Sequence, residues 1–492
     1  MSKKFFLISL FLFLAYFATR LYNLMLMPLF TDEAIYVRWS QIARYDAGWR
    51  FISLTDGKQP SFVWLTMTVM KLVSDPLLAG RLVSVGAGLI TLAGLYFLTK
   101  EIFKSSKTAF YACLIYLIFP MALMYDRMAL YDSLVGAAVV WALYFEILLV
   151  RRLRLDLALI LGMILGVGVL TKSSNFFSIY LLPFTLLLFG WKEKNKFKRL
   201  GKWFVLAGVA VVEAYGYYSI LRLSPFFHII GQKNNIFIFS FKEWVTHPWE
   251  FFYGNLLGLW DWTHGYFSWL VIFLIAGSFL FAHKYFKEKL LLFIWFVLPF
   301  TALALFGKVL YPRFIFFMLL MLIPLAALTM EKLSEVFRNK LIFIFLCFLL
   351  FFFNLKADFF ILTDTARAPI PKSDTNQYIN GWPAGGGIRE TINFLEKQAE
   401  KKKIYVASEG TFGSLPTYAV EIYLGDYKNV EKKGIWPLPV NIPTDLLSKA
   451  KIMPVYLILN PTQDPPPGWP LKLIARYQKG ISNTYLSLYQ IR

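Results

Sequence analysis

Eleven long apolar runs dominate the sequence and leave few folds open to it. Each run holds roughly 17–25 residues, the length that an α-helix needs to cross a bilayer core of about 30 Å. The runs lie near residues 4–22, 79–99, 108–125, 131–150, 155–171, 174–190, 202–222, 266–282, 289–306, 312–331 and 340–357. Only 16% of the residues are charged, too few to cover several soluble domains. The sequence therefore predicts a mainly α polytopic transmembrane bundle.

The formal charge of +21 is concentrated in the apolar part of the chain. Residues 1–356 carry 35 basic against 18 acidic side chains, whereas residues 357–492 carry 16 against 12. This placement favours membrane topology and anionic headgroups over nucleic acid, for which the sequence contains no binding motif. Membrane lipids are the partners that we expect for this charge.

Basic residues also predict how the spans are oriented. If residues 2–4 are cytoplasmic, the even-numbered connections are short and basic, as the positive-inside rule requires. Those connections carry Lys100, Lys104 and Lys107; Arg151, Arg152 and Arg154; six basic residues in 192–202; Lys284, Lys287 and Lys289; and Lys332, Arg338 and Lys340. The first run could instead be a cleaved signal peptide, although residues 14–20 match a cleavage site poorly. We expect a multi-pass protein of the plasma (inner) membrane with a cytoplasmic N-terminus.

The last part of the chain has a different composition. Proline-rich turns and Gly385–Gly387 separate short strand-like runs at 404–407, 455–459, 473–477 and 485–489, and a helical stretch at 388–402 precedes them. Such a pattern predicts a small α/β domain. With eleven crossings, residues 1–357 form the transmembrane domain and residues 358–492 a soluble extracytoplasmic domain.

The first predicted outside segment, residues 23–78, begins with an acidic pair, Asp32 and Glu33. Apolar residues recur at helical spacing up to Arg44, which predicts a helix lying at the membrane interface. One interpretation makes the two acids first-turn partners of the helix N-terminus. The other gives them a chemical role.

Cations occur on the predicted outside turns, against the positive-inside bias. They are Lys58 in a Gly/Pro turn, Arg127 with Asp132, Lys172, and Lys308 with Tyr311 and Arg313. Each one taken alone could be an ordinary interfacial side chain that extends towards water. Taken together, they predict an anionic ligand on the outer face.

Two further polar features remain open. His228, His247 and His264 lie in the fourth outside segment without a zinc-ligand spacing, so no metal is predicted, although a divalent metal could bind there. Glu213, near the middle of the seventh span, is either a proton or substrate residue or a hydrogen-bonded structural acid.

The order of these motifs resembles the GT-C class of lipid-linked-sugar glycosyltransferases. The branch in question holds protein O-mannosyltransferases, aminoarabinose transferases and RgtA/B/C/D-like enzymes. The resemblance rests on Asp32-Glu33 with Tyr36, Lys58-Gln59-Pro60, Arg127 with Asp132, Leu170-Thr171-Lys172, and the Lys308 to Arg313 turn. It covers residues 1 to about 357. The family commonly has Lys-Pro-Pro where this chain has Gln59 after the lysine.

The resemblance implies an enzyme that moves a sugar, with inversion, from a polyprenyl-phosphate donor to an acceptor hydroxyl on the extracytoplasmic face. The acceptor is a lipid, a protein or a glycan. Asp32 is the expected base, and Glu33 orients the acceptor or its loop. The expected donor-phosphate ligands are Lys58, Arg127, Lys172, Lys308 and Arg313, supported by Tyr36, Asp132 and Tyr311. This chemistry requires no cofactor.

A secondary transporter or lipid flippase is the alternative function. Such proteins typically contain internal repeats and spans broken by Gly or Pro at matched positions. The sequence shows neither, and eleven spans do not divide into equal halves. A membrane-anchored binding protein that works through residues 358–492 is a third, weaker hypothesis.

Overall fold

The computed structural model describes residues 3–281, 284–411 and 414–492 and divides the chain into two compact units. The first unit comprises Met1–Tyr22, Gly48–Leu65 and Arg81–Asp358. The second comprises Asn23–Ala47, Thr66–Gly80 and Phe359–Arg492. Part of the first predicted outside segment therefore belongs to the same unit as the C-terminal residues.

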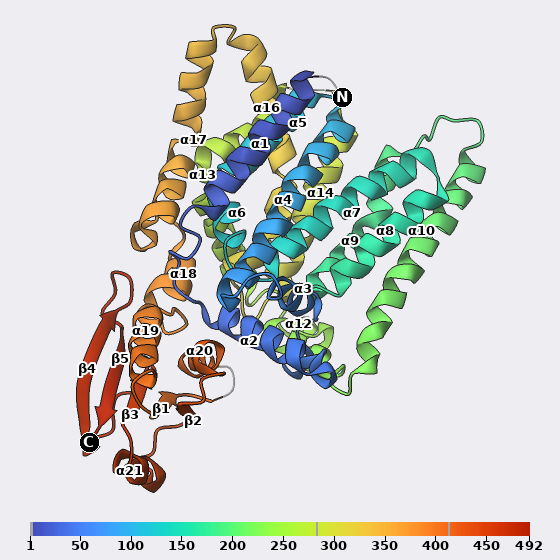
Figure 1. The fold of residues 1–492 in the computed structure, drawn as a ribbon. Helices are drawn as coiled ribbons and strands as arrows, with labels where there is room; N and C mark the ends of the chain where they lie inside the picture. The colour runs from blue at the N-terminus through green and yellow to red at the C-terminus, as the bar shows by residue number, and fades with distance from the viewer. Residues whose placement is uncertain (1–2, 282–283, 412–413) are drawn as a thin grey trace. The chain divides into compact units, whose positions relative to one another are not determined.

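The first unit is built from helices (Figure 1). Its elements, including those that run across its boundaries, are α1 (Lys3–Leu21), η1 (Ala47–Trp49), η2 (Ile52–Asp56), α3 (Ser61–Val69), α4 (Pro76–Phe103), α5 (Ser106–Leu117), α6 (Pro120–Tyr125), α7 (Asp132–Arg152), α8 (Leu155–Val169), η3 (Ser173–Asn175), α9 (Phe176–Leu181), η4 (Leu182–Leu188), α10 (Lys196–Ser219), η5 (Ile220–Leu223), α11 (Ile229–Phe237), α12 (Phe241–Thr246), α13 (Phe252–Phe281), α14 (Phe286–Phe306), η6 (Pro312–Ile315), α15 (Phe316–Leu320), α16 (Ile323–Val336) and α17 (Lys340–Thr363).

Within the described residues, six helices are long and apolar enough to cross a membrane. They are α4, α7, α10 with η5, α13, α14 and α17. A seventh candidate is the pair Pro312–Leu320 and Ile323–Val336, which is bent by 49°. Shorter apolar helices occupy Phe6–Leu21, Leu155–Val169 and Ser173–Leu188. The predicted mainly helical architecture is confirmed, whereas the count of eleven crossings stays a prediction.

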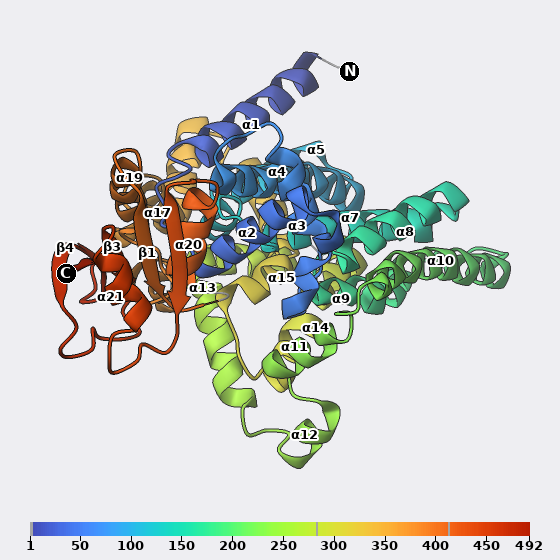
Figure 2. The same cartoon turned by 60° about the horizontal axis from the view of Figure 1, so that its bottom comes forward.

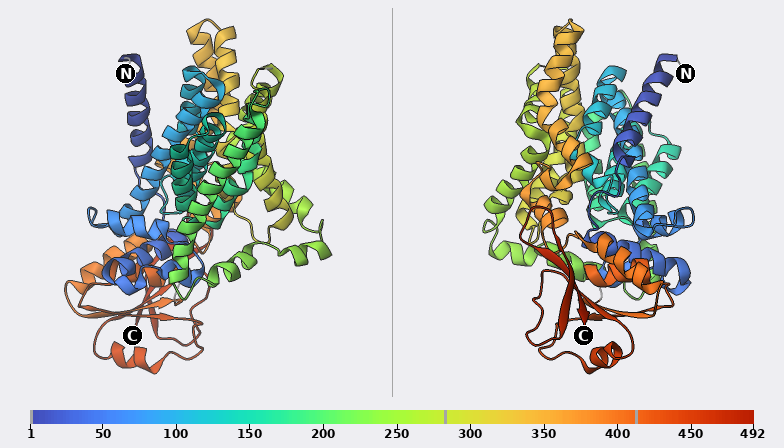
Figure 3. Two further views of the ribbon diagram at one scale, coloured as in Figure 1. Left: turned by 90° about the vertical axis from the view of Figure 1, so that its right-hand side faces the viewer. Right: turned by 60° about the vertical axis from the view of Figure 1, so that its left-hand side comes forward.

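Small side chains bring neighbouring helices of this unit close together. Helices α8 and α10 lie side by side (Figure 1) around a shared core that includes Leu161, Leu165, Ala207 and Ala210. Alanine at such positions lets helix backbones approach closely. Figure 2 shows α11 and α12 on the segment that links α10 to α13. After residues 337–339, α17 runs back beside α16 (Figures 1 and 3).

The second unit combines a helix from the first predicted outside segment with a small mixed sheet. Its elements are α2 (Thr31–Tyr45), η7 (Thr365–Arg367), α18 (Lys372–Thr375), the π-helical turn η8 (Asn376–Asn380), α19 (Ile388–Ala399), β1 (Ile404–Glu409), α20 (Leu415–Leu424), β2 (Val430–Ile435), α21 (Thr444–Ala450), β3 (Val455–Leu459), β4 (Leu471–Gln478) and β5 (Tyr485–Ile491).

The sheet has the strand order β2-β1-β3-β5-β4. Strand β1 pairs in parallel with β2 and β3, while β5 pairs antiparallel with β3 and β4. In register, Tyr405 faces Val455 and Val455 faces Ile491, and these side chains enter one buried core with Leu446 and Leu457. The predicted small α/β domain at the C-terminal end of the chain is confirmed.

Candidate functional site

Lys172 and Asp132 form the centre of a charged group in the first unit. Asp132 is the first residue of α7, and Lys172 is the extended residue between α8 and η3. Lys172 Nζ donates to Asp132 Oδ1 at 2.8 Å, and the two side chains are 28% and 6% exposed. The same Nζ lies 4.9 Å from the ring centroid of Phe314. The second, third and fifth predicted outside turns therefore meet at Lys172.

The turn that carries Lys58 is held against the same turns by hydrogen bonds. Gln59 Nε2 donates to Ser173 Oγ at 2.8 Å, and Tyr131 Oη donates to the Gln59 carbonyl at 2.8 Å. A proline at position 59 could not donate the first of these bonds, so the departure from the family pattern gives this turn an additional anchor. Gly57, at φ +66°, permits the turn itself.

Lys308 lies on the fifth turn and is connected to the Lys58 turn through α11. Its backbone N–H donates to the Phe237 carbonyl at 2.8 Å, and Lys58 Nζ lies 5.5 Å from the Phe237 ring centroid. Lys308 Nζ donates to Glu243 Oε1 at 2.9 Å. This bond holds the pKa of Glu243 down at about 2. Lys308 is thus already paired with a carboxylate.

Arg313 and Tyr311 lie on the same turn as Lys308 and close to the Lys172 group. Arg313 is 8% exposed, and its guanidinium carbon lies 5.1 Å from the Tyr311 ring centroid. Phe314, the next residue, is the ring beside Lys172. The structure therefore brings the four predicted cations Lys58, Lys172, Lys308 and Arg313 onto turns that contact one another; these cations are called the turn cations below.

Arg127 has a different environment. It is 2% exposed, and its Nη1 donates to the carbonyls of Thr19 at 2.9 Å and Tyr22 at 2.6 Å, at the C-terminal end of α1. The last carbonyls of a helix have no intrahelical partner, and a basic side chain satisfies them well. The observed bonds give Arg127 a structural task at the end of α1.

The residue before Arg127 is the centre of a buried cluster that sequence analysis missed. Asp126 accepts hydrogen bonds from Tyr116 at 2.9 Å, Ser133 at 3.0 Å and Tyr16 at 3.4 Å, and from Arg20 Nε at 3.4 Å. All five side chains are fully enclosed by protein. The sequence did contain a signal for this pair. Arg20 lies at the end of the first apolar run and Asp126 just after the third, so the two side chains can form an ion pair if these ends of the helices lie together.

The acidic pair lies at the start of α2 in the second unit. Glu33 is fully buried, and its Oε2 accepts the Phe30 N–H at 3.0 Å. Glu33 therefore caps its own helix, as one of the two interpretations of the sequence expected. Asp32 is half-buried, and Tyr36, one turn later, is 4% exposed with its ring 5.8 Å from that of Trp39.

A loop near the C-terminal sheet completes this helix N-terminus. The carbonyl of Pro383 accepts from both the backbone N–H of Thr31 at 3.0 Å and its Oγ1 at 2.9 Å. Phe30 and Ala384 form an isolated antiparallel bridge. The position of Asp32 in the second unit thus depends on residues more than 350 positions later in the chain.

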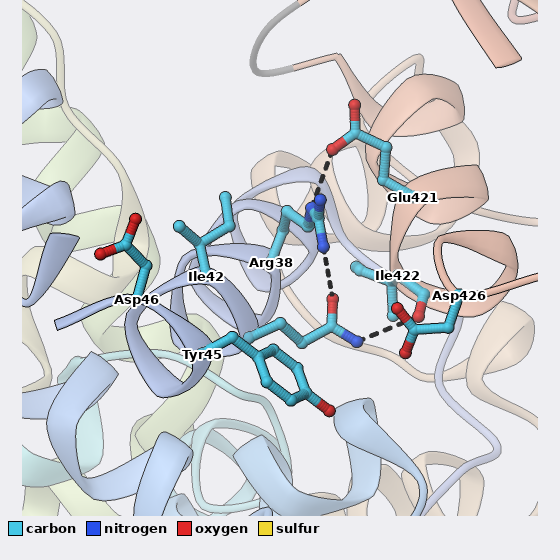
Figure 4. A pocket seen from close by; sticks show the side chains of 8 residues that line it. Arg38, Ile42, Tyr45, Asp46, Glu421, Ile422 and Asp426 are labelled. Atoms are coloured by element: carbon cyan, nitrogen blue, oxygen red, sulfur yellow. Dashed lines mark hydrogen bonds and ion pairs between the residues drawn. The ribbon is translucent and has the colours of Figure 1, made fainter. Parts of the chain in front are cut away.

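The opposite end of α2 borders an open, polar pocket of about 370 Å³ (Figure 4). Arg38 Nε donates to Glu421 Oε2 at 2.8 Å and its Nη1 to Gln41 Oε1 at 3.3 Å. Gln41 Nε2 in turn donates to the Ile422 carbonyl at 3.0 Å. These bonds attach α2 to α20 in addition to lining the pocket.

The two polar features that the sequence left open are Glu213 and the histidines of the fourth outside segment. The Glu213 carboxylate lies so close to Gly162 that a Cβ there would clash with it. His247 pairs with Glu250 at 3.5 Å and His264 with Asp261 at 3.3 Å, each on its own local segment. In the part of the chain that the structure describes, no three His, Cys, Asp or Glu residues gather as metal ligands would.

The fold is that of the GT-C glycosyltransferases. ArnT from Cupriavidus metallidurans in the apo state matches with a TM-score of 0.60 at 16% identity, over 98% of this chain and 97% of that one. The same enzyme bound to undecaprenyl phosphate matches over the same shares with a TM-score of 0.56 at 15% identity. The predicted resemblance to the GT-C class is confirmed at the level of the fold.

A third solved structure and one family model agree with this class. The archaeal oligosaccharyltransferase AglB from Archaeoglobus fulgidus, in complex with an inhibitory peptide and a dolichol-phosphate, matches with a TM-score of 0.51 at 13% identity, over 92% of this chain and 69% of that one. Residues 57–216 match the family described as dolichyl-phosphate-mannose-protein mannosyltransferase. No curated protein sequence matches the chain.

Proposed function

We propose that this protein is a membrane glycosyltransferase that transfers a sugar from a polyprenyl-phosphate donor to an acceptor hydroxyl on the extracytoplasmic face, with inversion. The observation that carries the proposal is the meeting of the turn cations on predicted outside turns. A donor of this type is supported by the similarity to ArnT bound to undecaprenyl phosphate and by the description of the matching family.

The turn cations would hold the donor phosphate. When the bond between the anomeric carbon and the phosphate oxygen breaks, the polyprenyl phosphate takes the electron pair and gains negative charge. Preorganised cations stabilise such charge most where water is excluded. Lys172 is the strongest candidate because it is partly exposed and has one carboxylate partner. Arg127 is the weakest, since a phosphate would have to replace its carbonyl partners.

Asp32 would act as the base for the acceptor. The acceptor oxygen attacks the anomeric carbon opposite to the leaving phosphate, and the carboxylate takes the hydroxyl proton as the new bond forms. A phosphate leaving group needs no proton, so a second carboxylic acid is not required. Glu33 contributes by fixing the first turn of α2, on which Asp32 lies. No metal is needed for these steps.

Replacing Asp32 by Asn tests this proposal. We expect Asp32→Asn to lower sugar transfer at least about 100-fold, the scale of general base catalysis, while the protein stays in the membrane fraction. Purified protein would be assayed for release of polyprenyl phosphate from dolichyl-phosphate mannose and from undecaprenyl-phosphate sugars. Asp156→Asn, at an exposed pair with Arg154 on a predicted cytoplasmic connection, is the matched control.

Two results would contradict the proposal. Turnover of Asp32→Asn at the wild-type rate removes Asp32 as the base. Movement of a labelled lipid across vesicles by the wild-type protein, with no sugar transferred from any donor of the panel, favours the flippase instead.

A further inference from the structure

A fully buried lysine follows the last residue of β4 in the second unit. Lys479 is 0% exposed, and its Nζ donates to the Ala384 carbonyl at 2.5 Å, to Asn460 Oδ1 at 2.5 Å and to the Trp382 carbonyl at 3.3 Å. A fourth acceptor, the Gly381 carbonyl, lies 3.5 Å from Nζ, so all three N–H groups of the lysine ammonium have acceptors within reach. The amine is therefore bound to the glycine-rich loop of residues 381–387.

Two more buried polar residues extend this network. Asn460 Nδ2 donates to the Trp382 carbonyl at 2.8 Å, and the Asn460 backbone N–H donates to Glu409 Oε2 at 2.7 Å. Burial raises the pKa of Glu409 to about 7 and lowers the pKa of Lys479 to about 7. The carbonyl of residue 382 thus has two side-chain donors, which leaves the loop little freedom to move.

The loop held by Lys479 is the one that completes the N-terminus of α2. Pro383 lies between two of the carbonyls that Lys479 binds, those of residues 382 and 384, and its own carbonyl accepts both bonds from Thr31. At Gly385 a Cβ would clash with the Leu29 carbonyl, so the loop backbone also contacts the residues before α2 directly. A continuous chain of contacts therefore joins Lys479 to the residue preceding Asp32.

Energetics argue against Lys479 being a stabilising core residue. Removing an amine from water costs several kcal/mol unless the protein replaces its hydration, so a buried lysine contributes little net stability even when it is fully hydrogen-bonded. The amine instead supplies directional hydrogen bonds. These bonds fix several carbonyls of a glycine-rich segment that would otherwise be flexible.

We propose that Lys479 is a positioning residue for the transfer reaction, which holds loop 381–387 and through Pro383 sets the first turn of α2 and with it Asp32. The inference rests on the proposed function, in which Asp32 is the base. It also assigns a task to the C-terminal sheet, whose β4–β5 connection carries the lysine. Lys479 itself contacts neither donor nor acceptor in this scheme.

Lys479→Met keeps an unbranched side chain of similar length and removes every donor. Because a base displaced by about 1 Å can lose on the order of 100-fold in rate, we expect kcat to fall about 10- to 100-fold. The KM for the lipid-linked donor stays unchanged, since the turn cations are not part of this chain of contacts. Lys433→Met, which removes an exposed pair with Asp445 at 2.6 Å, is the control and keeps wild-type kcat.

Thr31→Val tests the same path from its other end. It removes the Oγ1 bond to Pro383 and keeps the size of the side chain. We expect a smaller loss of kcat, about 3- to 10-fold on the scale of one hydrogen bond, again at constant donor KM. Because both variants loosen one contact chain, Thr31→Val adds little in the Lys479→Met background. The inference would be overturned if the losses of kcat in the two single variants multiply in the double variant. It would also be overturned if Thr31→Val keeps the wild-type kcat.

Hydrogen–deuterium exchange of the full-length protein in detergent separates this inference from the proposed function. We expect Lys479→Met to speed exchange of the amides of residues 31–35 at least about 10-fold, and Lys433→Met to leave it unchanged. Unchanged exchange in Lys479→Met refutes the positioning role. Faster exchange in a protein whose wild-type form transfers no sugar refutes the proposed function and leaves the coupling between Lys479 and α2 standing.

Discussion

A basic side chain meets a carboxylate at two places in the first unit, and the two pairs differ in how far water reaches them. Around Asp126, one arginine and three hydroxyls surround a carboxylate that water does not reach. Around Lys172, a lysine that is 28% exposed has one carboxylate partner and one aromatic ring. The Asp126 group is satisfied within the protein, whereas Lys172 is partly open to solvent.

Exposure and protein acceptors also differ between two of the predicted donor-phosphate ligands. Lys172 and Arg127 both lie on predicted outside turns, and both were expected to bind the donor phosphate. Arg127, however, donates to two backbone carbonyls and is 2% exposed. We therefore expect the number of protein acceptors around a cation, rather than its place along the chain, to decide whether it binds the donor phosphate.

The largest effect on stability is expected when the Asp126 group loses its cation. Arg20→Met leaves the Asp126 carboxylate buried without its cation, which costs about 3–5 kcal/mol. We expect Tm in detergent to fall by about 5 °C or more, with loss of folded protein during purification. Arg154→Met, at an exposed pair with Asp156, should leave Tm unchanged. An unaltered Tm in Arg20→Met would remove the distinction between the two groups.

A paired substitution compares the two predicted phosphate ligands directly. Lys172→Met should raise the donor KM about 10-fold, equivalent to about 1.4 kcal/mol, and should lower Tm less than Arg20→Met does, because the Lys172–Asp132 pair is partly exposed. Arg127→Met should lower Tm by several degrees and raise the donor KM less than Lys172→Met does. Lys332→Met, at an exposed pair with Glu335, serves as the control for both. The opposite ranking of donor KM would place Arg127, and not Lys172, on the phosphate.

The smallest effect concerns Glu409, a buried carboxyl group of the second unit that lies outside the predicted spans. Burial raises the pKa of Glu409 from 4.5 to about 7, so the folded protein binds more protons than the unfolded chain between these pH values. Its contribution to stability is therefore complete below pH 4.5 and is lost as pH rises through 7. Lys479, whose pKa is lowered to about 7, is protonated in both states through most of this range and opposes the decline only as pH approaches 7.

Glu409→Gln should flatten the decline of Tm between pH 5 and 7. Glu431→Gln is the matched control, since its two lysine partners hold the pKa of Glu431 at about 2 and its titration lies below this window. The control should shift Tm equally at both pH values. A slope that persists in Glu409→Gln would show that this carboxyl is not the group that titrates.

Much of the second unit was predictable from local patterns. The helical stretch expected at 388–402 is α19 (Ile388–Ala399), and the four expected strands are β1, β3, β4 and β5. Strand β2 was missed because Val430–Ile435 carries three charged residues in six and has no apolar alternation. It forms because the edge of β1 offers a parallel partner to its backbone, which is not a local property.

The roles of the predicted site residues stay predictions, and the partners of these residues were not predictable from the sequence. The outward cations and the acidic pair were identified from the sign and position of charge. The anchoring of the Lys58 turn by Gln59, the capping by Glu33 and the hold of Lys479 on loop 381–387 each join residues distant in sequence or depend on backbone geometry. No pattern in a single sequence states which of many donors will meet which acceptor.

The sequence by itself determined the helical class, the apolar runs and the outer placement that we expect for the cations. These follow from run length and charge because transfer of apolar groups from water is a property of each segment alone. Tertiary structure alone decided that Asp126 is enclosed, that Lys172 stays partly open and that a C-terminal lysine supports α2. The physical reason is that the behaviour of a polar group depends on the number of its partners and the water left to it, and both are fixed only when distant segments meet.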